Sequence, residues 1–512
     1  MKTNKFHNND GYKNCYLMGI DLGTSTLKVG IYDINGNEIA IQSIEYKLSY
    51  PGKDLVENDV EKYWNTICNL IKKTLTKINN PKKILAISLS SQGETIIPID
   101  SKGRPLRPAI VWLDSRSEKE ADDISKAFNP EEMFYITGQP SVDTSWPATR
   151  IKWFKENEPE IFDKAYKFLL LEDYITFKFT GKIFGENTVY NSTYYYDIIK
   201  LDYYEPILEY LKIDRKRLPE VVTPGTLIGN ISEEASNETN LDKNTKFIMG
   251  AMDQLAGAIG AGNIKTGTVT ETTGTAFAMV VSLDKPVFDR VSKIPCYIHV
   301  VKDKYCLMPY SITGGMVLKW FKDNFFITTE KIKSNRSIYD LMTDEASGIK
   351  PGCEGLIMLP HLSGAYIPEN NPKARGVYFG IGINHSRSHF VRAILESIGF
   401  IMRSDIELFT KMKIKIDKIV SLGGGAKSKL WNQIKSDICN IEVNVPKYTE
   451  TALLGASVIA GVGIGIYPDF ETATKNIIKI KEKYTPNKDN IGIYNETYKK
   501  YKKLYDSLKH LF

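Results

Sequence analysis

The sequence predicts an α/β protein whose two domains repeat one architecture. The chain has 512 residues, more than a single hydrophobic core usually supports. Its first half alternates apolar strands with an amphipathic helix, which is typical of a mostly parallel sheet. A strand, a hydroxyl-rich glycine turn and a second strand occur around "DLGTST" and again around "TETTGTA". This duplication predicts a domain boundary near residue 262.

The first half opens on three predicted strands. Apolar runs at residues 16–20 and 27–33 flank the first turn, and residues 39–46 alternate as a third strand. The segment "NDVEKYWNTICNLIKKTLTKI" has apolar residues spaced by three and four, which predicts a helix with Asn58 as its N-cap. Residues 83–91 form a buried strand, so helix and strand together predict a crossover unit.

The middle of the chain restarts this pattern. An apolar strand is predicted to end at Gly250, a small-residue helix follows, and two apolar runs flank residues 270–276. Farther on we predict an amphipathic helix over 388–409, and a strand, a triple-glycine turn and a helix over 418–438. Aromatic residues spaced by three and four over 494–508 predict a packed terminal helix.

The composition argues against a nucleic-acid-binding, disulfide-linked or membrane-spanning protein. The net charge is +6, but lysines are scattered among nearly as many acids, which indicates a solvated surface and no nucleic-acid partner. The six cysteines form no Cys-x-x-Cys pair, as expected for reduced thiols in the cytoplasm. No apolar window is long enough to span a membrane. We expect residues 1–14 to be a disordered extension. The sequence does not determine the oligomeric state, and a homodimer is one possibility.

The first turn carries the residue types of a phosphate site. Asp21 ends a buried strand, where a carboxylate is costly unless a cation such as hydrated Mg²⁺ compensates its charge. Gly23 lets the backbone approach an anion. Donors for phosphate oxygens and a positive charge come from Thr24, Ser25, Thr26 and Lys28. By itself the segment is equally compatible with an ordinary hairpin turn.

Two other turns and one carboxylate extend this pattern. Thr272–Thr275 repeats the donor-rich turn, so the two turns could hold a polyphosphate between them. The glycine turn at Gly423–Ser428 suits close approach to a base or ribose, although packing alone also explains such turns. None of the turns matches a P-loop. Asp253, at the start of a predicted helix, is either an N-cap or a carboxylate that accepts a hydroxyl proton during phosphoryl transfer.

The residues resemble the FGGY carbohydrate kinases, which include glycerol kinase, xylulokinase and ribulokinase. The similarity spans nearly all of residues 16–512 and its motifs occur in order. They include "GIDLGTSTLKVGIYD", "ISLSSQGETIIPIDSKGRPLRPAIVWLDSR", "IMGAMDQLAGAIGAG", "TTGTA", "GGMVLKWFKD" and "SLGGGAKSKLWNQIKSDI". The resemblance implies an actin-like, ribonuclease H-like ATPase fold, with two duplicated domains around a deep cleft. Residues 15–262 would form the substrate-binding domain and residues 263–512 the ATP-binding domain.

The resemblance also implies roles for single residues. Asp253 matches the position of the catalytic base, and Gln254 matches a substrate ligand. Asp21 matches a metal-associated aspartate, so Asp21 and Asp253 would both lie beside Mg²⁺. The positions that match the ATP site are Thr24, Ser25, Thr26 and Lys28 in the first phosphate turn, Gly274 and Thr275 in the second, Gly314 and Lys319 along ATP, and Gly424, Gly425 and Ala426 on the adenosine side.

The expected acceptor is a small sugar or polyol. Gly93 and Glu94 stand where glycerol kinases have Arg-Glu and xylulokinases Met-His, so the pocket is enlarged and Glu94 can accept hydroxyl hydrogen bonds. Trp112 is a candidate to stack on a sugar face. The segment "LRPAIVWLDSR" leans toward the xylulokinase-like branch, which favours a pentulose such as xylulose. Ribulose, ribitol, erythritol and glycerol are the alternatives.

The predicted reaction is phosphorylation of that acceptor by ATP, with closure of the cleft about a glycine-rich hinge over residues 255–265. Two alternative functions, from other classes of protein, remain compatible with the sequence at this point. An actin-like ATPase switch would use the same phosphate turns without an acceptor, and a relative that has lost activity would only sense sugar. Glu94, Asp253 and Gln254 have no purpose in a pure switch.

Overall fold

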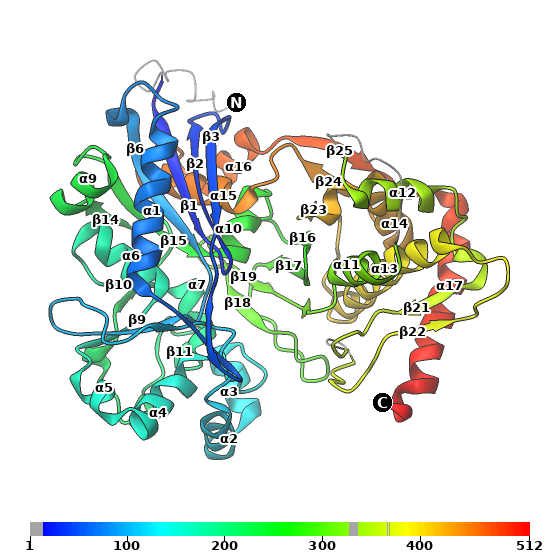
Figure 1. Cartoon of the computed structure of the whole chain (residues 1–512), viewed down its shortest axis with the longest axis horizontal. Helices are drawn as coiled ribbons and strands as arrows, with labels where there is room; N and C mark the ends of the chain where they lie inside the picture. Colours follow the sequence, from blue (N-terminus) through cyan, green and yellow to red (C-terminus); the bar gives the residue numbers. More distant parts are fainter. Residues whose placement is uncertain (1–13, 327–335, 366, 368) are drawn as a thin grey trace.

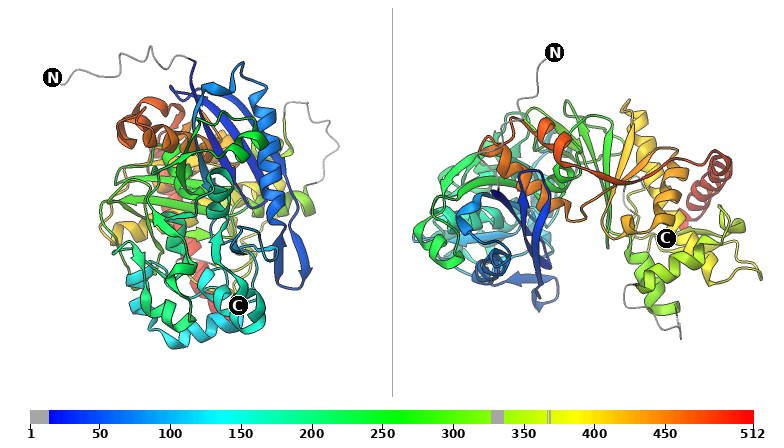
Figure 2. Two further views of the ribbon diagram at one scale, coloured as in Figure 1. Left: turned by 90° about the vertical axis from the view of Figure 1, so that its left-hand side faces the viewer. Right: turned by 90° about the horizontal axis from the view of Figure 1, so that it is seen from above.

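The computed structural model describes residues 14–326, 336–365, 367 and 369–512. These residues form two lobes, each built around its own β-sheet (Figure 1). Seen from above, the lobes lie side by side, and the C-terminal helix runs along the outer side of the second lobe (Figure 2). The extension predicted over residues 1–14 lies outside the described residues except at Asn14.

The first lobe contains a six-stranded sheet. β1 pairs antiparallel with β2 and parallel with β6, and β6 is parallel to β15, so the carboxyl ends of three strands meet at one edge. The order across the sheet is β14 (Leu227–Asn230), β15 (Lys246–Met252), β6 (Ile84–Ser91), β1 (Tyr16–Leu22), β2 (Thr26–Asp33) and β3 (Glu38–Glu45). The predicted hairpin and crossover unit are therefore confirmed.

The sheet of the second lobe repeats this arrangement. β16 pairs antiparallel with β17 and parallel with β23, as β1 does with β2 and β6. The order is β18 (Cys296–Ile298), β19 (Tyr305–Leu307), β17 (Phe277–Leu283), β16 (Thr268–Thr273), β23 (Lys418–Leu422), β24 (Val443–Pro446) and β25 (Ile480–Tyr484), with β20 (Tyr310–Ser311) beside β17. The duplicated architecture predicted from the two turn motifs is thus present.

Smaller sheets and helices complete the lobes. The remaining strands are β4 (Ser49–Gly52), β5 (Leu55–Asn58), β7 (Ile96–Ile99), β8 (Ala109–Ile110), β9 (Lys167–Leu170), β10 (Phe184–Glu186), β11 (Tyr196–Asp197), β12 (Asp202–Tyr203), β13 (Glu220–Val222), β21 (Ile357–Leu359) and β22 (Val377–Phe379). The helices are α1 (Val60–Leu75), α2 (Glu118–Ala127), α3 (Pro130–Thr137), α4 (Pro147–Asn157), α5 (Pro159–Lys164), α6 (Leu171–Thr180), α7 (Asn187–Tyr190), α8 (Glu205–Leu211), α9 (Glu233–Thr239), α10 (Asp253–Gly260), α11 (Met316–Phe325), α12 (Ile338–Ser347), α13 (Arg387–Lys411), α14 (Lys429–Cys439), α15 (Thr451–Gly463), α16 (Phe470–Ile477) and α17 (Lys488–Leu508). None of the helices in the described part of the chain has the length and apolarity needed to cross a membrane.

The first sheet is covered on both faces. Because side chains alternate along a strand, Leu17 and Met18 of β1 point to opposite sides of the sheet. Met18 joins a core cluster with Trp64 of α1, whereas Leu17 joins the cluster that contains Leu453 of α15. The helix from the late part of the chain therefore packs on the sheet of the first lobe, and the boundary at residue 262 stays a prediction.

Two short helices cross closely between the lobes. A Cβ built on Gly260 of α10 would lie 1.9 Å from the carbonyl oxygen of Thr451, and one on Gly455 of α15 would lie 1.8 Å from that of Ala256. Neither position can carry a side chain unless the backbone moves. The two glycines therefore permit a helix contact within residues 255–265, the segment that the sequence predicts to be a hinge.

Two boundaries predicted from the sequence are wrong in detail. The N-cap of α1 is Asp59, whose carboxylate accepts a hydrogen bond from the backbone N–H of Glu61 at 3.1 Å. Asn58 is instead the last residue of β5, where it pairs with Ala109. Similarly, β15 does not end at Gly250 but runs to Met252, because its last residues still pair with β6.

Candidate functional site

The ends of the parallel strands β1, β6 and β15 bring three acidic residues to one edge of the first sheet. Asp21 lies at the end of β1, Glu94 follows β6, and Asp253 follows β15. The Ser90 hydroxyl donates to Asp21 Oδ1 at 2.9 Å, and Lys28 Nζ lies 4.0 Å from Asp21 Oδ2. Burial raises the pKa of Asp21 despite these two partners.

Asp253 is the first residue of α10, and its carboxylate accepts the backbone N–H of Gln254 at 2.6 Å. Burial raises its pKa to about 7, and the negative charges of Asp21 and Glu94 contribute to the shift. The three carboxylates therefore share one electrostatic environment. A carboxylate with a pKa near neutrality can exchange a proton with a hydroxyl at physiological pH.

A hydrogen-bond relay fixes the corner that carries Asp253. The backbone N–H of Met252 donates to Thr188 Oγ1 at 3.0 Å, and that hydroxyl donates to Glu186 Oε1 at 2.7 Å. All three residues are buried. Thr188, which no sequence motif indicates, thus holds the backbone next to Asp253 in place.

Glu94 adopts a left-handed backbone conformation, with φ of +48°. Burial raises its pKa to about 7, while the Ser192 hydroxyl and the positive charge of Arg150 act in the opposite direction. A Cβ on Gly93 would lie 3.4 Å from Ser192 Oγ, so a larger side chain there would crowd this hydroxyl.

Arg150 holds the loops around Glu94. Its guanidinium donates to the carbonyl oxygens of Glu94 at 2.7 Å, Trp112 at 2.9 Å and Asp114 at 3.1 Å. The side chain is fully buried. These donors are thus directed at the backbone of the loops around Glu94, and this structural role could not be predicted from the sequence.

Side chains of the predicted first phosphate turn contact two other segments of the chain. The Trp112 indole N–H donates to Thr24 Oγ1 at 2.8 Å, which joins a candidate substrate residue to the turn. Lys28 Nζ donates to Glu450 Oε2 at 2.5 Å. The ammonium group of Lys28 is thus shared between Asp21 and Glu450. Ser25 is exposed and Thr26 half-buried.

The predicted nucleotide residues of the second lobe gather at the ends of β16 and β23. The backbone N–H of Gly315 donates to the carbonyl oxygen of Gly274 at 2.7 Å, and the backbone N–H of Gly314 donates to the carbonyl oxygen of Thr275 at 3.2 Å. A Cβ on Gly425 would lie 2.7 Å from Thr273 Cβ, so the glycine turn rests on β16.

Ala426 and Lys319, two further residues predicted to lie beside ATP, have different surroundings. Ala426 continues the glycine turn, and its carbonyl accepts from Asn432 Nδ2 at 2.8 Å. Lys319 instead lies on the exposed side of α11, with 62% of its side chain exposed, and its ammonium pairs with Asp323. The structure therefore gives Lys319 a local partner on its own helix.

The two groups of residues fit a magnesium-bound nucleotide. Gly424 is exposed, and a Cβ there would meet only the Thr273 carbonyl oxygen at 3.9 Å, which leaves an open cradle beside the turn. In the first lobe, the negative charges of Asp21 and Glu94 both act on Asp253, and a cation would relieve this repulsion. The described residues contain no cluster of three or more His, Cys, Asp or Glu side chains that could hold a metal alone. Mg²⁺ commonly needs only one or two carboxylates together with phosphate oxygens and water.

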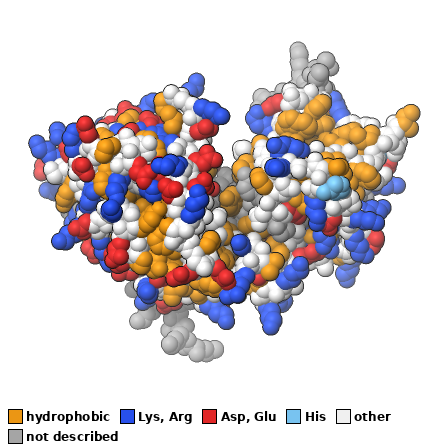
Figure 3. All heavy atoms as spheres, turned by 90° about the horizontal axis from the view of Figure 1, so that it is seen from below, with side chains coloured by type: hydrophobic (Ala, Val, Ile, Leu, Met, Phe, Trp, Pro, Cys, Tyr) orange, Lys and Arg blue, Asp and Glu red, His pale blue; other side chains and the backbone are white. Residues whose placement is uncertain are grey.

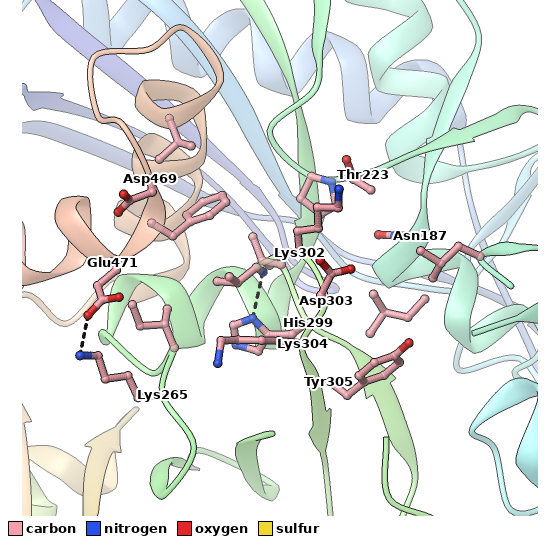
Figure 4. A pocket seen from close by; sticks show the side chains of 18 of the residues that line it. Asn187, Thr223, Lys265, His299, Lys302, Asp303, Lys304, Tyr305, Asp469 and Glu471 are labelled. Atoms are coloured by element: carbon pink, nitrogen blue, oxygen red, sulfur yellow. Dashed lines mark hydrogen bonds and ion pairs between the residues drawn. The ribbon is translucent and has the colours of Figure 1, made fainter. Parts of the chain in front are cut away.

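The surface is hollowed between the lobes (Figure 3). A separate cavity of about 480 Å³ lies between the β18–β19 hairpin and the start of α16 (Figure 4). Lys265 and Glu471 form an ion pair of 2.6 Å on its wall, and His299 Nδ1 accepts the backbone N–H of Val301. None of the predicted site residues lines this cavity.

Comparisons with known proteins cover both lobes. Residues 16–260 match the N-terminal domain of the FGGY family of carbohydrate kinases, and residues 270–464 match the C-terminal domain of that family. The chain is 30% identical over 483 residues to a gluconokinase from Bacillus subtilis (strain 168), covering 94% of this chain and 93% of that protein.

Two further relatives agree with these matches. A xylulose kinase from Lactococcus lactis subsp. lactis (strain IL1403) is 30% identical over 500 residues, covering 97% of each chain. A crystal structure of ligand-bound xylulose kinase from Lactobacillus acidophilus superposes with a TM-score of 0.88 at 27% identity, covering 96% of this chain and 98% of that one. The similarity therefore extends over nearly the whole chain.

Proposed function

The chain belongs to the FGGY family of carbohydrate kinases and is a phosphotransferase; as its reaction we propose transfer of the terminal phosphoryl group of ATP to a hydroxyl of a neutral pentulose such as xylulose. The observation that carries the proposal is the meeting of Asp21, Glu94 and Asp253 at the carboxyl ends of three parallel strands. Ligands of open α/β sheets bind outside this edge.

In this proposal Asp253 orients the acceptor hydroxyl and takes its proton as the phosphoryl group is transferred. A pKa of about 7 matches this task, because a general base works best when its pKa is near the operating pH. Gln254 and Glu94 bind the other hydroxyl groups. The relay from Glu186 through Thr188 keeps Asp253 at a fixed distance from the acceptor.

Kinases of this family use ATP as the phosphate donor. The second lobe would bind ATP through Gly274 and Thr275 on the phosphates and Gly424–Ala426 on the adenosine side. The first turn would complete the phosphate site from across the hollow between the lobes. Mg²⁺, held by Asp21 and Asp253, would neutralise charge on the phosphates. Closure of the lobes would exclude water, which is a competing acceptor.

The charge of the pocket favours a neutral acceptor. Two of the relatives act on different substrates, and gluconate, unlike xylulose, carries a carboxylate. Asp21, Glu94 and Asp253 would repel that group, since the negative charges of Asp21 and Glu94 already raise the pKa of Asp253. Arg150 directs its donors at three backbone carbonyls. Ribulose, ribitol, erythritol and glycerol are the alternative acceptors, whereas membership of the kinase family excludes the switch without an acceptor.

A coupled assay of ADP release tests the proposal. The purified protein is screened with ATP and Mg²⁺ against xylulose, ribulose, xylitol, ribitol, erythritol, glycerol and gluconate, with a sugar-free reaction as the control. We expect a pentulose to give the highest kcat/KM and gluconate to lie at least about tenfold lower. Preference for gluconate would contradict the neutral acceptor, and no stimulation by any compound would contradict the proposed substrate class.

A further inference from the structure

An ion pair lies buried below the predicted nucleotide turns of the second lobe. The ammonium of Lys435, in α14, contacts the carboxylate of Glu271, in β16. Both side chains have an exposed fraction of 0%. Transfer of two charges from water into a protein interior is costly, so the pair is not explained by its contribution to stability alone.

The pair is joined to both strands that lead into the turns. Thr273 Oγ1 donates to Glu271 Oε2 at 2.7 Å, and Lys435 Nζ donates to Thr273 Oγ1 at 3.1 Å. Ser421, which is directly opposite Glu271 in the parallel pairing of β16 and β23, donates to the same carboxylate. Lys435 also donates to Ser421 Oγ at 3.3 Å. Each charged group is therefore hydrogen-bonded to both strands.

The network reaches the glycine turn itself. A Cβ on Gly425 would lie 3.4 Å from Lys435 Nζ, so the ammonium supports the turn from below. On the other strand, Thr273 immediately precedes Gly274 of the second phosphate turn. The same four side chains thus fix the distance between the two turns.

We infer that Glu271 and Lys435 are positioning residues for nucleotide binding: their ion pair, together with Thr273 and Ser421, holds the second phosphate turn and the glycine turn at the spacing that one nucleotide requires. This inference rests on the proposed function, in which these turns bind ATP. It predicts that the pair affects ATP affinity while leaving the sugar site, on the other lobe, unchanged.

The test replaces both partners at once, because removing one would leave a buried unpaired charge that destabilises the fold. The variant is Glu271→Met/Lys435→Met. The matched control is Arg392→Met/Glu396→Met, a second buried ion pair of the same lobe, joined at 2.8 Å within α13 and bonded to Tyr494. Binding of a non-hydrolysable ATP analogue is measured by calorimetry, KM for the sugar by the ADP assay, and Tm by thermal unfolding.

We expect the Glu271/Lys435 variant to bind the analogue at least about tenfold more weakly than wild type, as expected when more than one hydrogen bond to a charged group is lost. The KM for the sugar should stay within about twofold. The control should bind the analogue within about twofold of wild type at a similar Tm.

Other results of these measurements would overturn either the inference or the proposed function. Wild-type affinity in a folded Glu271/Lys435 variant, or equal loss in both variants, would overturn the inference. Failure of the wild-type protein to bind the analogue would instead overturn the proposed function. Should the double variant not fold, Ser421→Ala removes a single hydroxyl from the network, and its analogue affinity should fall about threefold; unchanged affinity would overturn the inference.

Discussion

Gly455 and Ala256 lie in helices that are far apart in sequence, yet a Cβ on Gly455 would come within 1.8 Å of the Ala256 carbonyl oxygen. This contact between α15 and α10 connects the late part of the chain to the helix that begins at Asp253. Because the obstructing atom belongs to the backbone, a change of side-chain rotamer cannot relieve the clash. The crossing of the two helices therefore depends on glycine.

We predict that Gly455→Ala lowers the free energy of unfolding by about 1–3 kcal/mol, as for other overpacked sites. The control is Gly492→Ala in α17, where a Cβ meets no atom within 4 Å. There the substitution should stabilise the helix by about 0.5–1 kcal/mol. Denaturant unfolding of both variants checks the prediction, and equal stability of the two would show that the helix contact is not tight.

The relay beside Asp253 predicts a change in turnover. Thr188→Val preserves shape but removes the acceptor of the Met252 N–H, so the Asp253 corner shifts and kcat should fall by about tenfold to a hundredfold. Thr188→Ser, which keeps the hydroxyl, should restore most of the activity. The affinity for ATP should not change in either variant. A loss that is the same for valine and serine would mean that the side chain matters only for packing.

The pKa of Glu94 predicts how sugar binding depends on pH. Burial raises that pKa to about 7, so the carboxylate loses its charge and an acceptor site as the pH falls through 7. Sugar affinity should therefore be highest above pH 8 and weaken up to about tenfold by pH 6.

This measurement needs a background in which Asp253, with a similar pKa, does not titrate. We would compare Asp253→Asn with Asp253→Asn/Glu94→Gln by calorimetry without nucleotide. The single variant should show the pH dependence, and the double variant should bind more weakly with no dependence between pH 6 and 8. A pH dependence that persists in the double variant would assign the titration to another group.

Local patterns predicted the parts of the fold that local interactions determine. The hairpin at Asp21, its copy at Gly274 and the long helix α13 were recognisable because alternation and helical spacing are visible within short segments. The three carboxylates were each identified, although the sequence could not show that Asp21 and Glu94 raise the pKa of Asp253.

Contacts between distant segments could not be predicted. Lys28 and Glu450 are 422 positions apart, and Glu271 and Lys435 are 164 apart. The one available indication for Lys435 is its place four residues after Trp431, on the apolar side of a predicted helix. Without the position of β16, that lysine has no visible partner. The packing of α15 on the first sheet was hidden for the same reason.

The central claim is that Asp253 is the general base of phosphoryl transfer. Its most direct test is the rate of ADP and sugar phosphate formation by Asp253→Asn, compared with wild type on the best acceptor of the screen. We expect kcat to fall by at least about 10³. Analogue binding should be unchanged, and stability at pH 8 undiminished because a buried charge is removed. Turnover close to that of wild type would show that Asp253 is not the general base.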